Sequence, residues 1–154
     1  MTTLLIIILI MLTALPVQDQ FAGGSGTEED PYQVETLGQL QAIADTSYLD
    51  KHFIQIADID ASETVEWSDS LVFEPIGWWQ DFENNSPFTG SYDGSGFAIT
   101  DLHIDQPNGY NVGLFGYIDG AVIKNVALKN GNVSGNTRVG GTCRCQQGRG
   151  FQLV

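Results

Sequence analysis

The sequence contains very little cysteine and few basic residues, and both facts narrow the functions open to it. Of its 154 residues only Cys143 and Cys145 are cysteines, so the first 142 positions cannot be held together by disulfides and must rely on packing. Six Lys and Arg residues stand against 19 Asp and Glu, for a formal net charge of −13. Because phosphate groups and anionic lipids require a basic surface, this charge argues against nucleic acid and acidic membranes as partners.

Long hydrophobic runs are also scarce, and the one present lies at the start. An apolar run extends from Leu4 to Leu12 and continues more weakly to Leu15, before Pro16. It is too short to span a bilayer and has the length of a secretory hydrophobic region, so residues 1–20 are predicted to be an export leader. The protein is then secreted or on the cell surface and is not transmembrane. Since no Lys or Arg precedes the run and no clear A-x-A site follows it, a buried strand or a wrongly assigned start codon remains the alternative.

Helix signals are confined to one short stretch. After the Gly-rich and acidic segment that follows the leader, a first strand is expected around Tyr32 to Val34. In the next segment, TLGQLQAIAD, Thr36 and Gln39 have capping-box spacing. Four apolar residues share one helical face: Leu37, Leu40, Ile43 and Ala44. Residues 21–52 are therefore predicted to form an N-terminal cap with one strand and one short helix.

The rest of the chain has strand patterns and a repeat. HFIQIADID predicts one strand from its alternating apolar residues. Two segments align at an offset of 24 residues: FTGSYDGSGFAITDLHID (88–105) and VGLFGYIDGAVIKNVALK (112–129). The alignment matches Gly96 with Gly120, Ile99 with Ile123, Leu102 with Val126 and Ile104 with Leu128. Short repeated strands separated by Gly, Asn and Asp indicate a solenoid, here residues 53–141. A β-sandwich with two similar hairpins is the alternative.

The repeat also predicts which side chains lie inside. Leu102 and Ile104 alternate with His103, as Val126 and Leu128 alternate with Ala127, so these four apolar side chains are predicted to face a shared core. Asn125 and Asn130 lie at strand ends and suit turns with positive φ.

Five sequence blocks follow one another in this chain: FAGGSGTEEDPYQVETLGQLQAIA, HFIQIADID, EPIG, FTGSYDGSGFAITDLHI and VGLFGYIDGAVIKNVAL. In order and spacing they resemble the N-terminal part of bacterial secreted proteins with GLUG repeats. The resemblance covers about residues 21 to 141. It implies a right-handed parallel β-helix of the pectate-lyase-like kind, capped by the short helix and exported. It implies an architectural role in adhesion, and it transfers no catalytic residue.

The last thirteen residues depart from this pattern. Where such proteins continue VGG with Leu-Val-Gly-x-Asn-x-Gly, this chain has TCRCQQGRG. Shifted by one base, the codons of the tail permit Leu-Val-Gly-Val-Asn-Arg-Gly-Gly-Val-Ser-Ser, so residues 142–154 are predicted to be a non-native, frameshifted tail on an N-terminal fragment. The alternative is that Cys143 and Cys145 bind a metal or form a redox pair, although C-x-C supplies two of the four ligands of a zinc site.

Two pairs of acidic residues have spacings that could serve a chemical site. Asp58 and Asp60 lie two apart, which places both carboxylates on one side of a strand, as for an acid/base or calcium pair. Asp93 and Asp101 flank a Gly-rich stretch faintly similar to a calcium loop. Solvated strand residues and a Gly-rich turn explain these patterns better, so the sequence predicts no catalytic residue, no metal site and no cofactor.

The aromatic group in EPIGWWQDFENNSPF is the best binding candidate. Trp78, Trp79 and Phe82 lie in a polar, turn-rich insertion, and exposed aromatic rings stack on sugars. The alternative is that one Trp caps the core beneath the loop.

Together these patterns predict a non-enzymatic β-helix module of a secreted or cell-surface protein that serves adhesion or display, with surface glycans or host proteins as partners. The alternatives are the N-terminal part of a carbohydrate-active β-helix enzyme, whose catalytic residues would lie elsewhere, and a truncated gene product without function.

Overall fold

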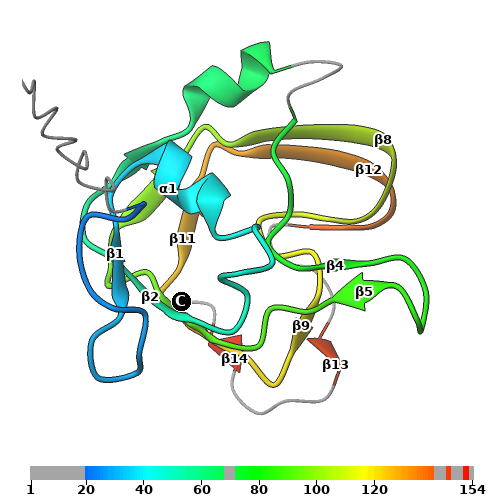
Figure 1. Cartoon of the computed structure of the whole chain (residues 1–154). Coiled ribbons are helices and arrows are strands. Elements are labelled where there is room, and N and C mark those ends of the chain that lie inside the picture. The colour runs from blue at the N-terminus through cyan, green and yellow to red at the C-terminus, as the bar shows by residue number, and fades with distance from the viewer. Residues whose placement is uncertain (1–19, 68–71, 141–144, 147–150, 153–154) are drawn as a thin grey trace, which may run out of the picture.

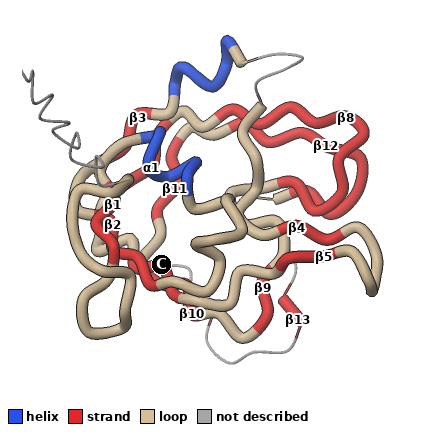
Figure 2. The backbone as a smooth tube through the Cα atoms, viewed as in Figure 1, coloured by secondary structure: helices blue, strands red, loops and turns tan. Residues whose placement is uncertain are grey.

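The structure is a computed structural model that describes residues 20–67, 72–140, 145–146 and 151–152, and within these the chain is almost entirely strand and turn (Figures 1 and 2). The strands are β1 (Tyr32–Val34), β2 (His52–Gln55), β3 (Ile59–Asp60), β4 (Trp78–Trp79), β5 (Asn85–Ser86), β6 (Ser91–Asp93), β7 (Ala98–Thr100), β8 (His103–Val112), β9 (Ile118–Asp119), β10 (Val122–Lys124), β11 (Ala127–Lys129), β12 (Asn132–Val139), β13 (Cys145–Gln146) and β14 (Phe151–Gln152). The helices are α1 (Leu37–Ala42) and the 3₁₀ turn η1 (Ser62–Glu66). The predicted all-β class is confirmed. Most of the predicted leader, residues 1–19, lies outside the described residues.

Apart from the antiparallel pair β4 and β5, the described strands pair in parallel, and they pair in a repeating order. The main sheet has the order β1-β2-β6-β10-β14, and a second sheet has the order β11-β7-β3. Four consecutive strands, β6 to β9, pair one by one with the next four, β10 to β13, and every one of these pairings is parallel. The chain thus passes through the same sheets in the same order twice. Two antiparallel hairpins, the sandwich alternative, do not match these pairings.

The repeat exists, but its register differs from the alignment at 24 residues. Ile99 of β7 pairs with Leu128, and Ile123 of β10 pairs with Tyr92. The alignment instead matched β7 with β10, which belong to different sheets. The alignment was wrong because a short apolar strand after a Gly turn occurs in both sheets. Strands of different sheets therefore resemble each other in sequence as closely as strands that pair.

The predicted strand HFIQIADID is also divided. Its first part is β2 in the main sheet and its last part is β3 in the second sheet. Asp58, between them, accepts a hydrogen bond through Oδ1 from the backbone N–H of Ala98 at 2.7 Å. The chain turns a corner here, which alternation of apolar residues alone does not indicate.

Helix α1 forms where it was expected. The Thr36 side chain accepts from the backbone N–H of Gln39 at 3.3 Å, and the Gln39 side chain accepts in turn from the N–H of Glu35 at 2.8 Å. Leu40 and Ile43 are fully buried. The second helical turn, η1, was not predicted; the Asp60 carboxylate accepts from the N–H of Ser62 at 2.9 Å, and the Thr64 hydroxyl donates to the carbonyl of Ala61 at 2.6 Å.

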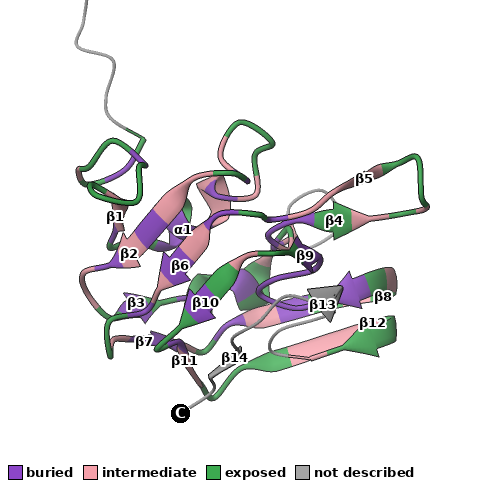
Figure 3. Ribbon diagram, turned by 90° about the horizontal axis from the view of Figure 1, so that it is seen from below, coloured by how far each residue is buried: buried purple, intermediate pink, exposed green. Residues whose placement is uncertain are grey.

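One continuous core runs through the stack of strands (Figure 3). Phe53, Tyr92 and Ile123 are partners across β2, β6 and β10, and all three are buried. The predicted inward positions Leu102, Ile104 and Val126 are also buried, while Leu128 is half-buried and packs against the core. Burial of each such side chain contributes about 1.5 to 3 kcal/mol, so the core stabilises residues 20–140, which contain no cysteine.

The corners are formed by residues in the left-handed region. Asn125 and Asn130 have φ of 54°, as predicted, and Asp101 has φ of 56°. Short polar side chains tolerate this conformation better than other non-glycine residues.

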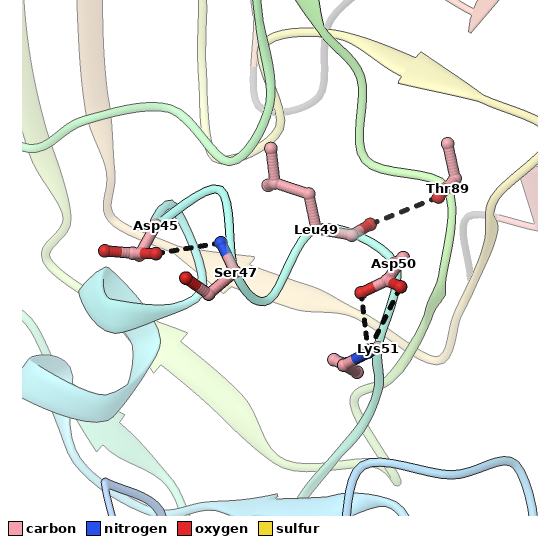
Figure 4. Close-up of polar contacts among 6 residues, drawn as sticks. All are labelled: Asp45, Ser47, Leu49, Asp50, Lys51 and Thr89. Atoms are coloured by element: carbon pink, nitrogen blue, oxygen red, sulfur yellow. Dashed lines mark hydrogen bonds and ion pairs between the residues drawn. The ribbon is translucent and has the colours of Figure 1, made fainter.

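Glycine is required at one corner because backbone segments approach closely. The Leu49 carbonyl oxygen accepts from the N–H groups of Thr89 and Gly90 at 2.8 and 3.2 Å, and Figure 4 shows Leu49 beside Thr89. A Cβ on Gly90 would lie 1.8 Å from the Lys51 carbonyl oxygen. Gly90→Ala is therefore expected to lower the free energy of unfolding by at least about 2 kcal/mol, measured by urea denaturation.

The matched control is Gly38→Ala. Gly38 lies in α1 with nothing within 4 Å of an added Cβ, so the substitution should raise the free energy of unfolding by about 0.5 to 1 kcal/mol. Equal effects of the two substitutions would contradict the close approach at Gly90.

Candidate functional site

The predicted aromatic group lies on a hairpin that projects from the stack of strands (Figure 1). Strands β4 and β5 pair antiparallel, with Trp78 opposite Ser86 and Trp79 opposite Asn85. At the base of the hairpin, the carbonyl oxygen of Gly77 accepts a hydrogen bond from the N–H of Tyr117 at 3.1 Å. Gly77 has a φ of 73°, and a Cβ added there would lie 2.2 Å from the Tyr117 carbonyl oxygen. The hairpin is thus fixed to the strands at its base.

The aromatic side chains differ in exposure. Phe82 at the tip is 89% exposed and Trp78 is 43% exposed, whereas Trp79 is half-buried. The rings of Trp79 and Phe82 meet edge to face, with centroids 6.2 Å apart and an interplanar angle of 88°. The structure therefore brings the three predicted residues onto one hairpin. Trp67, which the prediction did not single out, is half-buried and packs against the core.

The tip of the hairpin is held by one carboxylate. Asp81 Oδ1 accepts from the backbone N–H groups of Glu83 and Asn84 at 2.9 and 2.8 Å, and both carboxylate oxygens accept from the Asn84 side-chain amide. The side-chain bond from Asn84, followed by the two backbone bonds, lowers the pKa of Asp81 below its usual range. At neutral pH the tip is thus ordered by an ionised Asp81, which fixes where Phe82 is presented.

The acidic pairs considered from sequence have structural roles. Asp58 and Asp60 are exposed, and each accepts a backbone N–H, from Ala98 and Ser62 respectively. Hydrogen bonds from the backbone and the hydroxyl of Ser62 lower the pKa of Asp60. Within residues 20–67 and 72–140, no cluster of three His, Cys, Asp or Glu side chains is placed to hold a metal ion.

Parts of the predicted tail, residues 142–154, lie outside the residues that the structure describes. Cys143 is not among the described residues, and for Cys145 the backbone alone is described, as part of β13 beside Ile118. Strand β14, also in the tail, lies beside Ile123 and Lys124. The frameshifted tail and its metal or redox alternative both remain predictions.

A group that the sequence did not reveal lies on the outer face of the main sheet. His52, Ser91 and Val122 are partners on β2, β6 and β10, and the next outward positions are Asp93 and Lys124. They line a groove of about 540 Å³. No sequence signal could have joined these residues, because they come together only through the register of the strands.

Comparison with known proteins gives two relatives. The chain is 45% identical over 121 residues to "Halomucin" of Haloquadratum walsbyi, which aligns with 76% of this chain but 1% of that protein. It is 34% identical over 109 residues to a "Putative Gly-rich membrane protein" of Evansella cellulosilytica, which aligns with 70% of this chain and 12% of that protein. The chain thus spans a small part of the length of either relative.

No family model matches the chain, so the resemblance to GLUG-repeat proteins stays a prediction. No solved structure matches it. None of the helices in the described part of the chain has the length and hydrophobicity needed to cross a bilayer.

Proposed function

We propose that the chain is a non-catalytic module of a secreted or cell-surface protein, built as a right-handed parallel β-helix, that serves adhesion or display. The β-helix is supported by the repeated parallel pairing of β6 to β9 with β10 to β13. A location at the surface is supported by the names of the two relatives, one a halomucin and the other a membrane protein. The small share of each relative that aligns is consistent with one module within a long protein.

The observation that carries an adhesive role is the rigid aromatic hairpin. Soluble proteins seldom expose a Phe and a Trp together on a projecting element, and such a group usually marks a contact surface. The rings of Trp79 and Phe82 meet on this hairpin, Trp78 is exposed on the same strand as Trp79, and the tip carries the polar Asp81 and Asn84. This combination suits glycans, since a sugar ring offers a C–H face for stacking and hydroxyls for hydrogen bonds.

The test is a titration of the full chain with neutral hexasaccharides (cellohexaose, maltohexaose and chitohexaose), followed by tryptophan fluorescence. We expect at least one to bind with a change in emission, and Phe82→Ala and Trp78→Ala each to weaken binding by tenfold or more, about 1.4 kcal/mol.

Val65→Ala is the matched control, because Val65 is an exposed apolar residue (64%) on η1, a different part of the chain. It should bind as the unmodified chain does. Binding that Phe82→Ala and Trp78→Ala leave unchanged, or no binding to any of the three sugars, would contradict a glycan-contacting hairpin.

A further inference from the structure

The groove on the main sheet has the size of a ligand site. Its volume of about 540 Å³ falls in the range of small-molecule pockets, roughly 300 to 1,000 Å³. Its floor is the outer face of β2, β6 and β10, which lie side by side in Figure 3. Glu28 and Pro31, in the loop before β1, and the glycines Gly90 and Gly120 also contribute to its lining. Segments distant in sequence thus form one open groove.

One half of the groove carries a fixed hydroxyl–imidazole pair. His52 Nδ1 and Ser91 Oγ are 2.8 Å apart, and both side chains are half-buried on adjacent strands. Because each side chain restricts the rotamers of the other, the pair presents its remaining hydrogen-bonding capacity in a set direction.

The other half carries a carboxylate and an ammonium group. Lys124 Nζ lies 3.2 Å from Asp93 Oδ2, while Asp93 Oδ1 accepts from the Ser95 N–H and from the Asn125 side chain, both at 2.9 Å. Burial of Asp93 raises the pKa of its carboxyl, but the bonds from Asn125, Ser95 and Lys124 outweigh it, and the net pKa is lowered. The groove therefore holds a hydrogen-bond acceptor, the Asp93 carboxylate, beside a hydrogen-bond donor, the Lys124 side chain.

An acceptor and a donor this close match two adjacent hydroxyl groups. A hydroxyl donates one hydrogen bond and accepts others, so one member of a vicinal pair can donate to Asp93 while its neighbour accepts from Lys124. Ile54 and Val122 line the same groove with apolar surface, which suits the C–H bonds of a sugar ring. The excess of acidic residues, with Glu28 in the lining, disfavours an anionic ligand.

We infer that this groove is a second glycan-binding site, which recognises a neutral sugar unit of a polysaccharide through vicinal hydroxyls held by Asp93 and Lys124, with Ser91 and His52 binding a further hydroxyl. The inference deepens the proposed adhesive function and rests on it for the class of ligand. It does not depend on the aromatic hairpin, which lies on other strands.

The experiment uses the full chain with Phe82 replaced by alanine, so that the hairpin contributes little, and the same three neutral hexasaccharides, measured by calorimetry. We expect one of them to bind and to shift the backbone amide resonances of Ser91 and Val122. Lys124→Met and, separately, Ser91→Ala should each weaken this binding about tenfold. Lys129→Met is the matched control, because Lys129 is exposed on β11 in the second sheet, and it should leave binding unchanged.

Three results would overturn the inference: no binding to the Phe82→Ala chain, binding that neither Lys124→Met nor Ser91→Ala weakens, or hexagalacturonate, an acidic sugar, binding more tightly than every neutral one. The two proposals are distinguishable. Loss of binding in Phe82→Ala, with no effect of Lys124→Met in the otherwise unmodified chain, leaves the hairpin alone as the glycan contact, whereas the reverse result leaves the groove alone.

Discussion

Replacing Phe88 with alanine is expected to lower the free energy of unfolding by about 3 to 5 kcal/mol. Phe88 is fully buried between two other aromatic side chains, with ring centroids 6.2 Å from Phe53 and 5.5 Å from Phe115. Its backbone bridges in parallel to Ile118. Truncation leaves a cavity in the middle of the stack that packed strands on both sides cannot collapse to fill.

The measurement is urea denaturation followed by circular dichroism, with Phe82→Ala as the control. The same substitution at Phe82, which is 89% exposed, should change the free energy of unfolding by less than about 1 kcal/mol. If the two variants were equally destabilised, the assignment of Phe88 to the core and Phe82 to the surface would be wrong.

Salt is expected to stabilise the protein strongly, with the melting temperature rising steadily from low to molar NaCl. Nineteen acidic residues face six basic ones, so exposed carboxylates repel one another in the compact state. Two ion pairs among the described residues, Lys51–Asp50 and Lys124–Asp93, are at least partly exposed, and exposed pairs of this kind offset little of the repulsion. At molar ionic strength the screening length falls to about 3 Å, and the repulsion is largely removed.

A variant with fewer charges separates screening from other salt effects. Glu28, Glu29 and Asp30 are consecutive and exposed, and Glu28→Gln, Glu29→Gln and Asp30→Asn together remove three negative charges. This triple variant should melt higher than the unmodified chain at low salt and gain less from added NaCl. A melting temperature that did not rise with NaCl would contradict the prediction that charge repulsion limits stability.

Helix caps, turn residues and inward-facing strand positions could be predicted, because each depends on a short segment of the sequence. The Thr36 cap, the apolar face of α1 and the turn residues Asn125 and Asn130 were all correct, because each depends on neighbours within a few positions. The inward residues Leu102 and Ile104 were correct for the same reason, since alternation is local to one strand.

Register was not predictable, because it depends on which distant strand lies alongside. Ile99 was matched with Ile123 but pairs with Leu128. The corner at Asp58, where one predicted strand becomes two, depends on the N–H of Ala98, far along the chain. A single sequence contains no information on that contact.

The two candidate sites differ in the same way: one depends on a single segment and the other on the pairing of distant strands. Trp78, Trp79 and Phe82 could be selected from sequence because they lie within one insertion, and the structure places them on one hairpin. The groove of His52, Ser91 and Lys124 needed three strands in register before its residues became neighbours.

Successive passes of the chain stack in parallel, and backbone NOEs between β7 and β11 measure this arrangement. We expect Hα to amide NOEs linking Ile99 with Leu128 and its neighbours, and no strong Hα–Hα NOEs between these strands, because closely opposed Hα pairs arise in antiparallel ladders. Strong Hα–Hα NOEs between β7 and β11, or backbone NOEs that place Ile99 beside Ile123, would contradict it.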